Sequence, residues 1–359
     1  MSNGEFEVAT ADVKDAFLMV PQPEDEKVAI MCGGKSYKLM RCLPGQRTAA
    51  NRWYVLFRDT AKEFGLVEDI MQPTLMKMDK LYLTLHVDDL LMVGRRALID
   101  GFISFLESKG WKVGETFEYL KRKITRVDDG YIIRANEKHI EEIAAEADIF
   151  KKKRKTTPGS DLSRHDWGDA LEGKELTAFR SVVGKMLYIA NERPDAQHTI
   201  QVLASKMSSP VTKSWYDACH LASNLFNTMD YGIKIFDPKK GKSVLDMRSI
   251  EDVEEKPDHM LEIVTDADYA GNQETRKSTT SYQIYMDGNL IEAKVRGQRS
   301  IALSSGESEY VAMVSGSSKG MFLRHIWEFL CGDVPDTVCR TDSSAARGMV
   351  GRIGQGASH

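Results

Sequence analysis

Two adjacent aspartates, Asp88 and Asp89, interrupt the otherwise apolar segment LYLTLHVDDLLMVG, which runs from Leu81 to Gly94. Burying one carboxylate without a partner is costly, and two neighbouring carboxylates also repel each other. One interpretation is a hairpin turn between two short apolar strands, since Asp is common in turns. The other is a metal site, in which a divalent cation neutralises both charges.

A third aspartate favours the metal site. In the segment VATADVKDAF, Asp12 follows an apolar strand. An acid that ends one strand and a pair of acids at the tip of a hairpin can converge on one point. Hard oxygen ligands of this kind select Mg²⁺. Two such ions about 4 Å apart can activate an attacking hydroxyl and stabilise the leaving oxygen of a phosphoryl transfer.

Carboxylates also gather in the last third of the sequence. They occur in the segments MLEIVTDADYAG, SSGESEYVA and TVCRTDSSAA, which we predict to be a strand, a helix start and a second strand. Five of these acids lie at the ends of the predicted strands or at the helix start: Asp266, Asp268, Glu307, Glu309 and Asp342.

These acids also have ordinary structural explanations. Ser304 and Glu307 fit the S-x-x-E capping box, in which side chains bind the free N–H groups at a helix start. Asp342 precedes two serines and could cap a helix itself. Taken singly, each acid favours the structural role.

The composition bounds the class of protein. The 359 residues, with 42% hydrophobic and 28% charged side chains, indicate a globular protein of two or three domains. The formal net charge of −4 provides no global positive field that would indicate a nucleic-acid partner. Five scattered cysteines without a C-x-x-C pair indicate reduced thiols. With no signal-peptide pattern and no apolar run of the roughly 20 residues that a membrane span needs, we expect a cytoplasmic or nuclear location.

Apolar periodicity and turn residues predict mixed α and β structure throughout. In the first part we expect a strand running into a turn over 5–20, a helix over 47–65, two strands over 80–94, a helix over 97–110 and a hairpin turning at Asp129-Gly130. Next we expect helices over 137–153, 177–195 and 215–229, and a polar linker over 155–176. In the last part we expect strands over 260–271 and 299–305, a hairpin turning at Asp287-Gly288, a helix over 307–330, and a strand that enters a helix over 337–350.

Three segments together resemble a known family. In order and spacing, ADVKDAFLMVP, LMRCLPGQRTAANRWY and LHVDDLLMVG are similar to the palm motifs of the reverse transcriptase of copia-type LTR retrotransposons. The later segment LTAFRSVVGKMLYIANERPD is similar to the region that follows the polymerase in that family, and the resemblance continues to the C-terminus.

The resemblance implies roles for particular residues of the polymerase. The acids that would bind its two Mg²⁺ ions, or Mn²⁺, are Asp12, Asp88 and Asp89. Phe17 would be the aromatic gate that excludes the 2′-hydroxyl of a ribonucleotide, although a core aromatic is an equal interpretation of this residue alone. The loop that supports the nucleotide and template would contain Pro44, Gly45 and Gln46.

The last third resembles the ribonuclease H domain of the same family. The resemblance implies that its metal-binding acids include Asp266, Glu309 and Asp342, again with two Mg²⁺. The segment RKSTTSY, from Arg276 to Tyr282, is also similar to the copia form of this domain. The family's fourth acid should follow a His near the C-terminus, and this sequence stops at His359. We therefore expect the second metal to be bound more weakly and cleavage to be reduced.

The expected fold class is α+β. We expect a reverse-transcriptase palm over 1–135 (an antiparallel sheet with helices, its fingers missing upstream), a helical thumb and connection over 136–255, and an RNase H-like α/β domain over 256–359. The implied partners are an RNA or DNA template-primer, an RNA–DNA hybrid and deoxynucleoside triphosphates, and no membrane. Two alternatives stay open: an inactive retroelement remnant that at most binds nucleic acid, and a nuclease whose palm serves only for binding.

Overall fold

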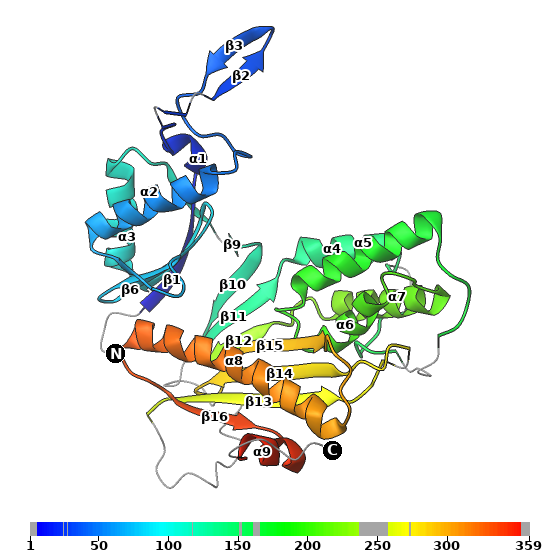
Figure 1. The fold of residues 1–359 in the computed structure, drawn as a ribbon. Coiled ribbons are helices and arrows are strands. Elements are labelled where there is room, and N and C mark those ends of the chain that lie inside the picture. Colours follow the sequence, from blue (N-terminus) through cyan, green and yellow to red (C-terminus); the bar gives the residue numbers. More distant parts are fainter. Residues whose placement is uncertain are drawn as a thin grey trace. The chain divides into compact units, whose positions relative to one another are not determined.

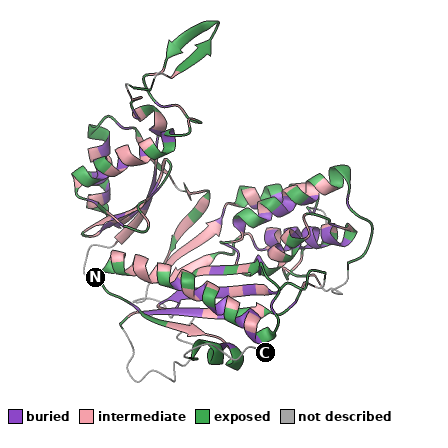
Figure 2. Cartoon of the chain, viewed as in Figure 1, coloured by how far each residue is buried: buried purple, intermediate pink, exposed green. Residues whose placement is uncertain are grey.

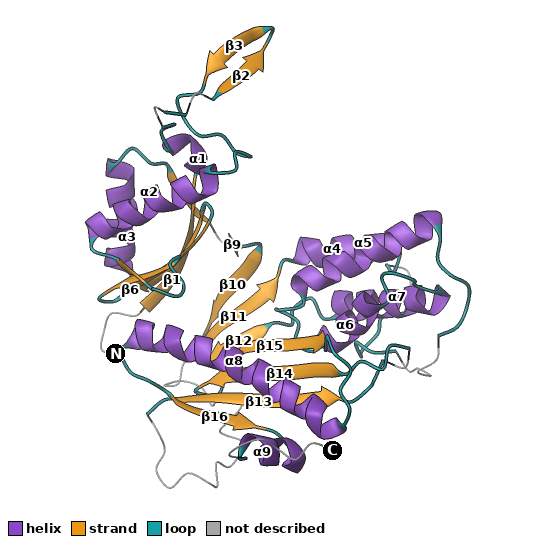
Figure 3. Ribbon diagram, in the orientation of Figure 1, coloured by secondary structure: helices purple, strands orange, loops and turns teal. Residues whose placement is uncertain are grey.

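The structure, a computed structural model, describes residues 6–23, 25–26, 28–116, 118–150, 153–160, 166–236, 258–272 and 274–352. These residues belong to two compact units that divide between Lys121 and Arg122. Each unit combines β-sheet with α-helices (Figures 1 and 3), which confirms the predicted α+β class. The expected boundary at 255–256 and the last residue, His359, lie outside the described residues.

The first unit is built on a six-stranded antiparallel sheet in the order β4-β5-β6-β7-β1-β8. Along β6 the side chains of Leu81, Leu83 and Leu85 are buried, and the residues between them are half-buried. This period of two is typical of a strand with one face on the core, so the predicted pair of strands around the two aspartates is confirmed. The strands are β1 (Phe6–Val13), β4 (Val67–Glu68), β5 (Leu75–Met78), β6 (Leu81–His86), β7 (Asp89–Arg95) and β8 (Val113–Thr116).

Two helices complete the core of this unit, α2 (Ala49–Phe64) and α3 (Arg96–Ser108). The buried ring of Phe57 in α2 meets Phe102 of α3 edge to face, with ring centroids 6.4 Å apart. As predicted, α2 ends at Gly65, whose φ of 108° suits a residue without a Cβ. The remaining elements are α1 (Ala16–Met19), the two-stranded hairpin of β2 (Ala29–Cys32) and β3 (Lys35–Lys38), and β9 (Glu118–Tyr119).

The second unit begins with an antiparallel hairpin and a group of helices. The predicted turn at Asp129-Gly130 is confirmed, since it joins β10 to β11. The predicted helix over 137–153 is wrong at its end, because Asp148 takes a left-handed φ of 48° soon after α4 stops. The structure also contains a helix, α6, that was not predicted. These elements are β10 (Arg122–Val127), β11 (Gly130–Ala135), β12 (Ile233–Phe236), α4 (Glu137–Glu146), α5 (Gly173–Ile189), α6 (Gln197–Ser205) and α7 (Thr212–Asn227).

The last part of the second unit is a four-stranded sheet covered by one long helix. Its order is β15-β14-β13-β16, and β13 and β16 are parallel. Helix α8 lies across one face of this sheet, with its buried side toward the strands and its exposed side away from them (Figures 1 and 2). In the described part of the chain, no helix is both long and apolar enough to cross a membrane. The elements are β13 (Met260–Asp268), β14 (Thr279–Met286), β15 (Asn289–Gly297), β16 (Asp336–Arg340), α8 (Ser305–Cys331) and α9 (Ser344–Val350).

The predicted strand over 299–305 is wrong. This segment is an irregular connection between β15 and α8, and Leu303 is 87% exposed. The backbone N–H of Leu303 donates to the carboxylate of Glu307, at 2.7 Å, instead of to a neighbouring strand. The apolar side chains suggested a strand, but the backbone N–H of Leu303 binds Glu307 at the start of the helix and is not paired with a strand.

Two glycines let α8 lie close to β13. A Cβ built at Gly316 would approach Thr265 Cγ2 to 2.8 Å, and one at Gly320 would meet Ile263. The contact matters for function because the same helix carries Glu309 near its start.

Replacing Gly316 with Val should lower the free energy of unfolding by about 1–3 kcal/mol, since extra methyl groups have no space at this contact. A matched control is Gly184→Val in α5, where nothing lies within 4 Å of a Cβ. Urea unfolding of both variants would measure the difference. Equal stabilities would contradict the close contact between α8 and β13.

Candidate functional site

Three acids from distant parts of the sequence converge in the second unit. Asp266 lies on β13, Glu309 in the first turns of α8, and Asp342 just after β16. One carboxylate oxygen from each lies within 4.8 Å of the others. Three negative charges at this separation repel strongly unless a cation lies between them.

Neighbouring residues take the helix-capping roles that the sequence left open. Ser304 Oγ accepts the N–H of Glu307 at 3.1 Å and so caps α8. Ser343 Oγ accepts the N–H of Ala346, also at 3.1 Å, and caps α9. The helix caps therefore account for Glu307 and Ser343, and they leave the carboxylates of Glu309 and Asp342 without that role.

Glu309 is the buried member of the set, with 9% of its surface exposed. Its Oε1 accepts the N–H of Ala267 at 3.2 Å, and no hydrogen-bond donor among the described residues reaches its buried Oε2. Burial raises the pKa of Glu309, and the charges of Asp266 and Asp342 raise it further. A buried carboxylate oxygen without a donor, beside two other acids, fits a divalent cation and its preference for oxygen ligands.

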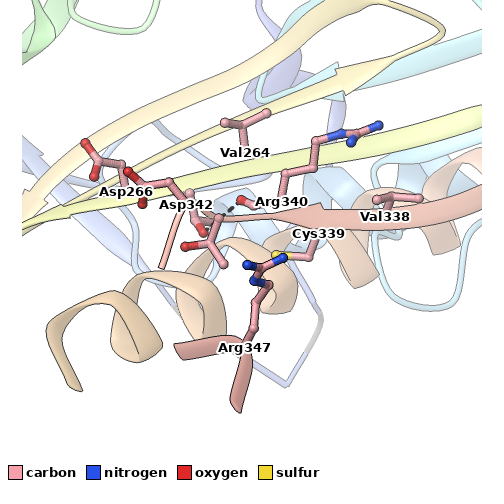
Figure 4. Close-up of a pocket in the computed structure, with 9 residues that line it drawn as sticks. Val264, Asp266, Val338, Cys339, Arg340, Asp342 and Arg347 are labelled. Carbon is pink, nitrogen blue, oxygen red and sulfur yellow. Dashed lines mark hydrogen bonds between the residues drawn. The ribbon is translucent and has the colours of Figure 1, made fainter. Parts of the chain in front are cut away.

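The other two acids face solvent along a cleft of about 580 Å³. Asp266 and Asp342 lie beside each other at one end of this cleft (Figure 4). Two basic residues, Arg340 and Arg347, also line it. Sequence reasoning missed both, although Arg340 lies within the quoted segment TVCRTDSSAA and Arg347 directly follows it.

Mg²⁺ should raise the unfolding temperature of the second unit. Because the folded-state pKa of Glu309 is raised, the carboxylate site favours folding below the unfolded pKa, and this stability is lost as the pH rises through the raised value. At pH 8 we expect Mg²⁺ at about ten times its Kd to raise the unfolding temperature by about 3–6 °C. Near pH 4.5, about the pKa of an unfolded Glu, the increase should be smaller because protons compete.

Scanning calorimetry with and without Mg²⁺ would measure this increase. The control is Asp266→Asn, which should unfold at a higher temperature than the parent without metal and gain less from Mg²⁺. An equal gain in the parent and in Asp266→Asn would contradict a cation at these acids.

The acids predicted for the palm lie at one end of the sheet in the first unit. Asp12 of β1 is directly opposite Asp89 of β7 in the antiparallel register. The N–H of Val13 donates to the carbonyl of Asp88 at 3.0 Å. Asp88 itself lies in the two-residue turn between β6 and β7, where Val87 has a left-handed φ of 58°. Such a conformation is strained for a β-branched residue, and strain of this kind is concentrated at functional turns.

The pKa values of Asp12 and Asp89 are raised, as expected for carboxylates that lie close together. Burial raises the pKa of Asp12, and Asp88 raises it further. The pKa of Asp89 is also raised, by burial first and then by the charges of Asp88 and Asp12. Among the described residues, however, only the acids of the second unit bring three carboxylates within 4.8 Å of one another. The structure thus assembles the palm acids less tightly than the second set.

The predicted nucleotide-contacting residues lie in two other segments of the first unit. Phe17, in α1, is half-buried and packs against the core. The loop predicted to support the nucleotide is a turn just before α2, in which Gly45 has a φ of 92°. Gln46 closes this turn, because its side-chain oxygen accepts the N–H of Leu43 at 3.1 Å. Pro44 and Gly45 are exposed at its tip.

Comparisons with known proteins agree with this architecture. No family model matches the chain. The chain is similar to the retrovirus-related Pol polyprotein from transposon RE2 of Arabidopsis thaliana, at 24% identity over 289 residues and 79% of this chain. It is also similar to the one from transposon TNT 1-94 of Nicotiana tabacum, at 27% identity over 372 aligned residues and 95% of this chain. The chain spans only 18% and 26% of the lengths of these two relatives.

A solved structure supports the same fold. The foamy viral protease-reverse transcriptase in complex with an RNA/DNA hybrid matches with a TM-score of 0.56 and 15% identity, over 88% of this chain and 37% of that chain. This likeness concerns the fold alone. The similarity in sequence is to the Pol polyproteins of the transposons. The chain is therefore similar in sequence to retrovirus-related Pol polyproteins from transposons, and it shares its α+β fold with the foamy viral protease-reverse transcriptase.

Proposed function

We propose that the chain is the reverse transcriptase and ribonuclease H part of a copia-type retrotransposon Pol polyprotein. Its reactions would be RNA-directed DNA synthesis in the first unit and cleavage of the RNA strand of an RNA–DNA hybrid in the second. Its substrates would be a template-primer, deoxynucleoside triphosphates and the hybrid. The solved structure that shares the fold is a complex with an RNA/DNA hybrid, which supports a nucleic-acid partner.

The observation that carries the proposal is the convergence of Asp266, Glu309 and Asp342. These residues would hold two Mg²⁺ ions, which when bound supply an activated water and stabilise the leaving oxygen of the phosphodiester. Glu309 is suited to a fixed ligand because burial and the Ala267 N–H hold its carboxylate in place. Asp266 and Asp342 face the cleft, where a phosphate of the RNA strand can approach them.

The polymerase assignment rests on the palm acids. Asp12 and Asp89 lie opposite each other with raised pKa values, and Asp88 projects from the strained turn beside them. They would hold the two Mg²⁺ ions of nucleotide addition. Phe17 would exclude ribonucleotides, and the turn at Gly45 would support the incoming nucleotide.

Two alternatives make different predictions. An inactive remnant would neither extend a primer nor cleave a hybrid, although it could still bind nucleic acid. A nuclease with a palm used only for binding would cleave without extending, and the looser assembly of the palm acids favours this alternative over a polymerase alone.

One assay separates these functions. A labelled RNA template annealed to a DNA primer is incubated with Mg²⁺ and the four deoxynucleotides, and both strands are followed. We expect primer extension and RNA cleavage together. Cleavage alone would support the nuclease, and silence on both readouts from a folded sample would support the remnant.

A further inference from the structure

The cleft beside the carboxylates has a basic side that the proposed metal chemistry does not use. Asp266 and Asp342 lie at one end of the cleft, and Arg340 and Arg347 line it further along (Figure 4). Arg347 extends from α9 toward Cys339 of β16, whereas Arg340 projects from the other side of that strand (Figure 4). The two arginines therefore reach the cleft from different directions.

The two arginines differ in their electrostatic environment. Arg340 forms an ion pair with Glu262, a carboxylate with only 2% of its surface exposed. Its charge is therefore already balanced within the protein. Arg347 is exposed, and among the residues that the structure describes no Asp or Glu forms an ion pair with it. Its guanidinium is thus available to an anion that enters the cleft.

An exposed arginine at a helix end also has a structural explanation. Arg347 lies in the last turn of α9, where a positive charge interacts favourably with the helix dipole. That role is a contribution to stability alone. It would have no effect on the binding of nucleic acid, so the two roles can be separated by experiment.

We propose that Arg347 binds a phosphate of the cleaved strand, next to the phosphate that lies at Asp266 and Asp342. This proposal rests on the hybrid-cleaving function proposed above and adds a positioning residue to it. The planar guanidinium can donate two parallel hydrogen bonds to one phosphate. A strand anchored at both points would be held in line along the cleft, with its scissile bond at the acids.

The test is binding, measured separately from cleavage. The full chain carrying Asp266→Asn, which blocks cleavage, is titrated with a fluorescent 18-base-pair RNA–DNA hybrid at several salt concentrations. Adding Arg347→Gln should weaken binding about tenfold, as loss of a hydrogen bond to a charged group does. It should also reduce the slope of log K against log salt by about 0.7–0.9, the value of one phosphate contact.

Two further variants separate the effect of the charge from that of the hydrogen bonds and provide a control. Arg347→Lys should restore the salt slope but not the full affinity, because Lys keeps the charge and loses the paired hydrogen bonds. Arg352→Gln is the matched control, since Arg352 is also exposed and does not line the cleft; it should bind like the parent. An unchanged affinity and slope in Arg347→Gln would overturn the proposal.

A modified substrate identifies the contact. When the phosphate next to the scissile one is replaced by an uncharged methylphosphonate, Arg347→Gln should have no additional effect, because the contact has already been lost. A full additional effect would overturn the assignment to that phosphate. If Arg347→Gln weakens binding of the hybrid as expected but the unmodified chain does not cleave it, the nuclease function fails and the phosphate contact stands. If the parent does not bind the hybrid at all, both proposals fail.

Discussion

Replacing Asp266 with Asn should abolish cleavage of the RNA strand of a hybrid and leave primer extension unchanged. Asn has nearly the same shape, so the change removes a charge from a site where three carboxylates lie within 4.8 Å. Both metals would lose an anionic ligand, and a metal supplies several kcal/mol of transition-state stabilisation. We expect the rate of cleavage to fall by at least about a thousandfold, which corresponds to about 4 kcal/mol.

The matched control for this prediction lies two residues away. Asp268 is on the same strand and is exposed, and it does not belong to the group of converging acids. Asp268→Asn should therefore cleave at close to the parent rate in the same gel assay. Cleavage that survived in Asp266→Asn would contradict the proposed site. A loss of extension together with cleavage would contradict two independent active sites.

The hairpins of the fold could be predicted from sequence because their turns depend on local chemistry. Asp287 and Gly288 have φ values of 47° and 78°, conformations that Asp tolerates and that Gly adopts freely. The turn at Asp129-Gly130 and the end of α2 also depend on a glycine with a positive φ, at Gly130 and Gly65. In each case, the residue that determines the structure lies within a few positions of the feature that it causes.

The family resemblance chose Glu309 over its neighbour Glu307, and the tertiary structure supplies the physical reason for that choice. Glu307 and Glu309 both begin α8, but only Glu309 turns toward β13, because Glu307 binds the backbone of the preceding connection. That orientation depends on how α8 lies on the sheet, which the contact at Gly316 helps to set. Helix-capping chemistry at the helix start does not by itself contain this information, and only the resemblance to a family motif indicated Glu309. The strand wrongly expected over 299–305 fails for the same reason, since Ile301 and Leu303 are exposed instead of packing on a sheet.

For the acids predicted for the palm, the sequence motifs are stronger evidence than the geometry of the structure. Their motifs gave the stronger resemblance to a family, and the register of β1 with β7 places Asp12 opposite Asp89. Like charges directly opposite each other on a sheet are destabilising. Burial and the neighbouring acids accordingly raise the pKa values of Asp12 and Asp89. A cation would relieve this repulsion, which gives the first unit a physical reason to bind metal even though its three carboxylates are spread more widely.

The double replacement Asp88→Asn with Asp89→Asn should accordingly abolish primer extension. It removes two of the three charges that would hold the metals, so extension should fall by at least about a thousandfold. Cleavage of the hybrid should persist, because the acids of the second unit are intact. The control is Asp79→Asn, at the exposed turn between β5 and β6, away from the predicted acids. Extension that continued in the double variant would show that these aspartates only form a hairpin turn. Extension that was lost while cleavage continued would support the metal site, and with it a polymerase that acts through Asp12, Asp88 and Asp89.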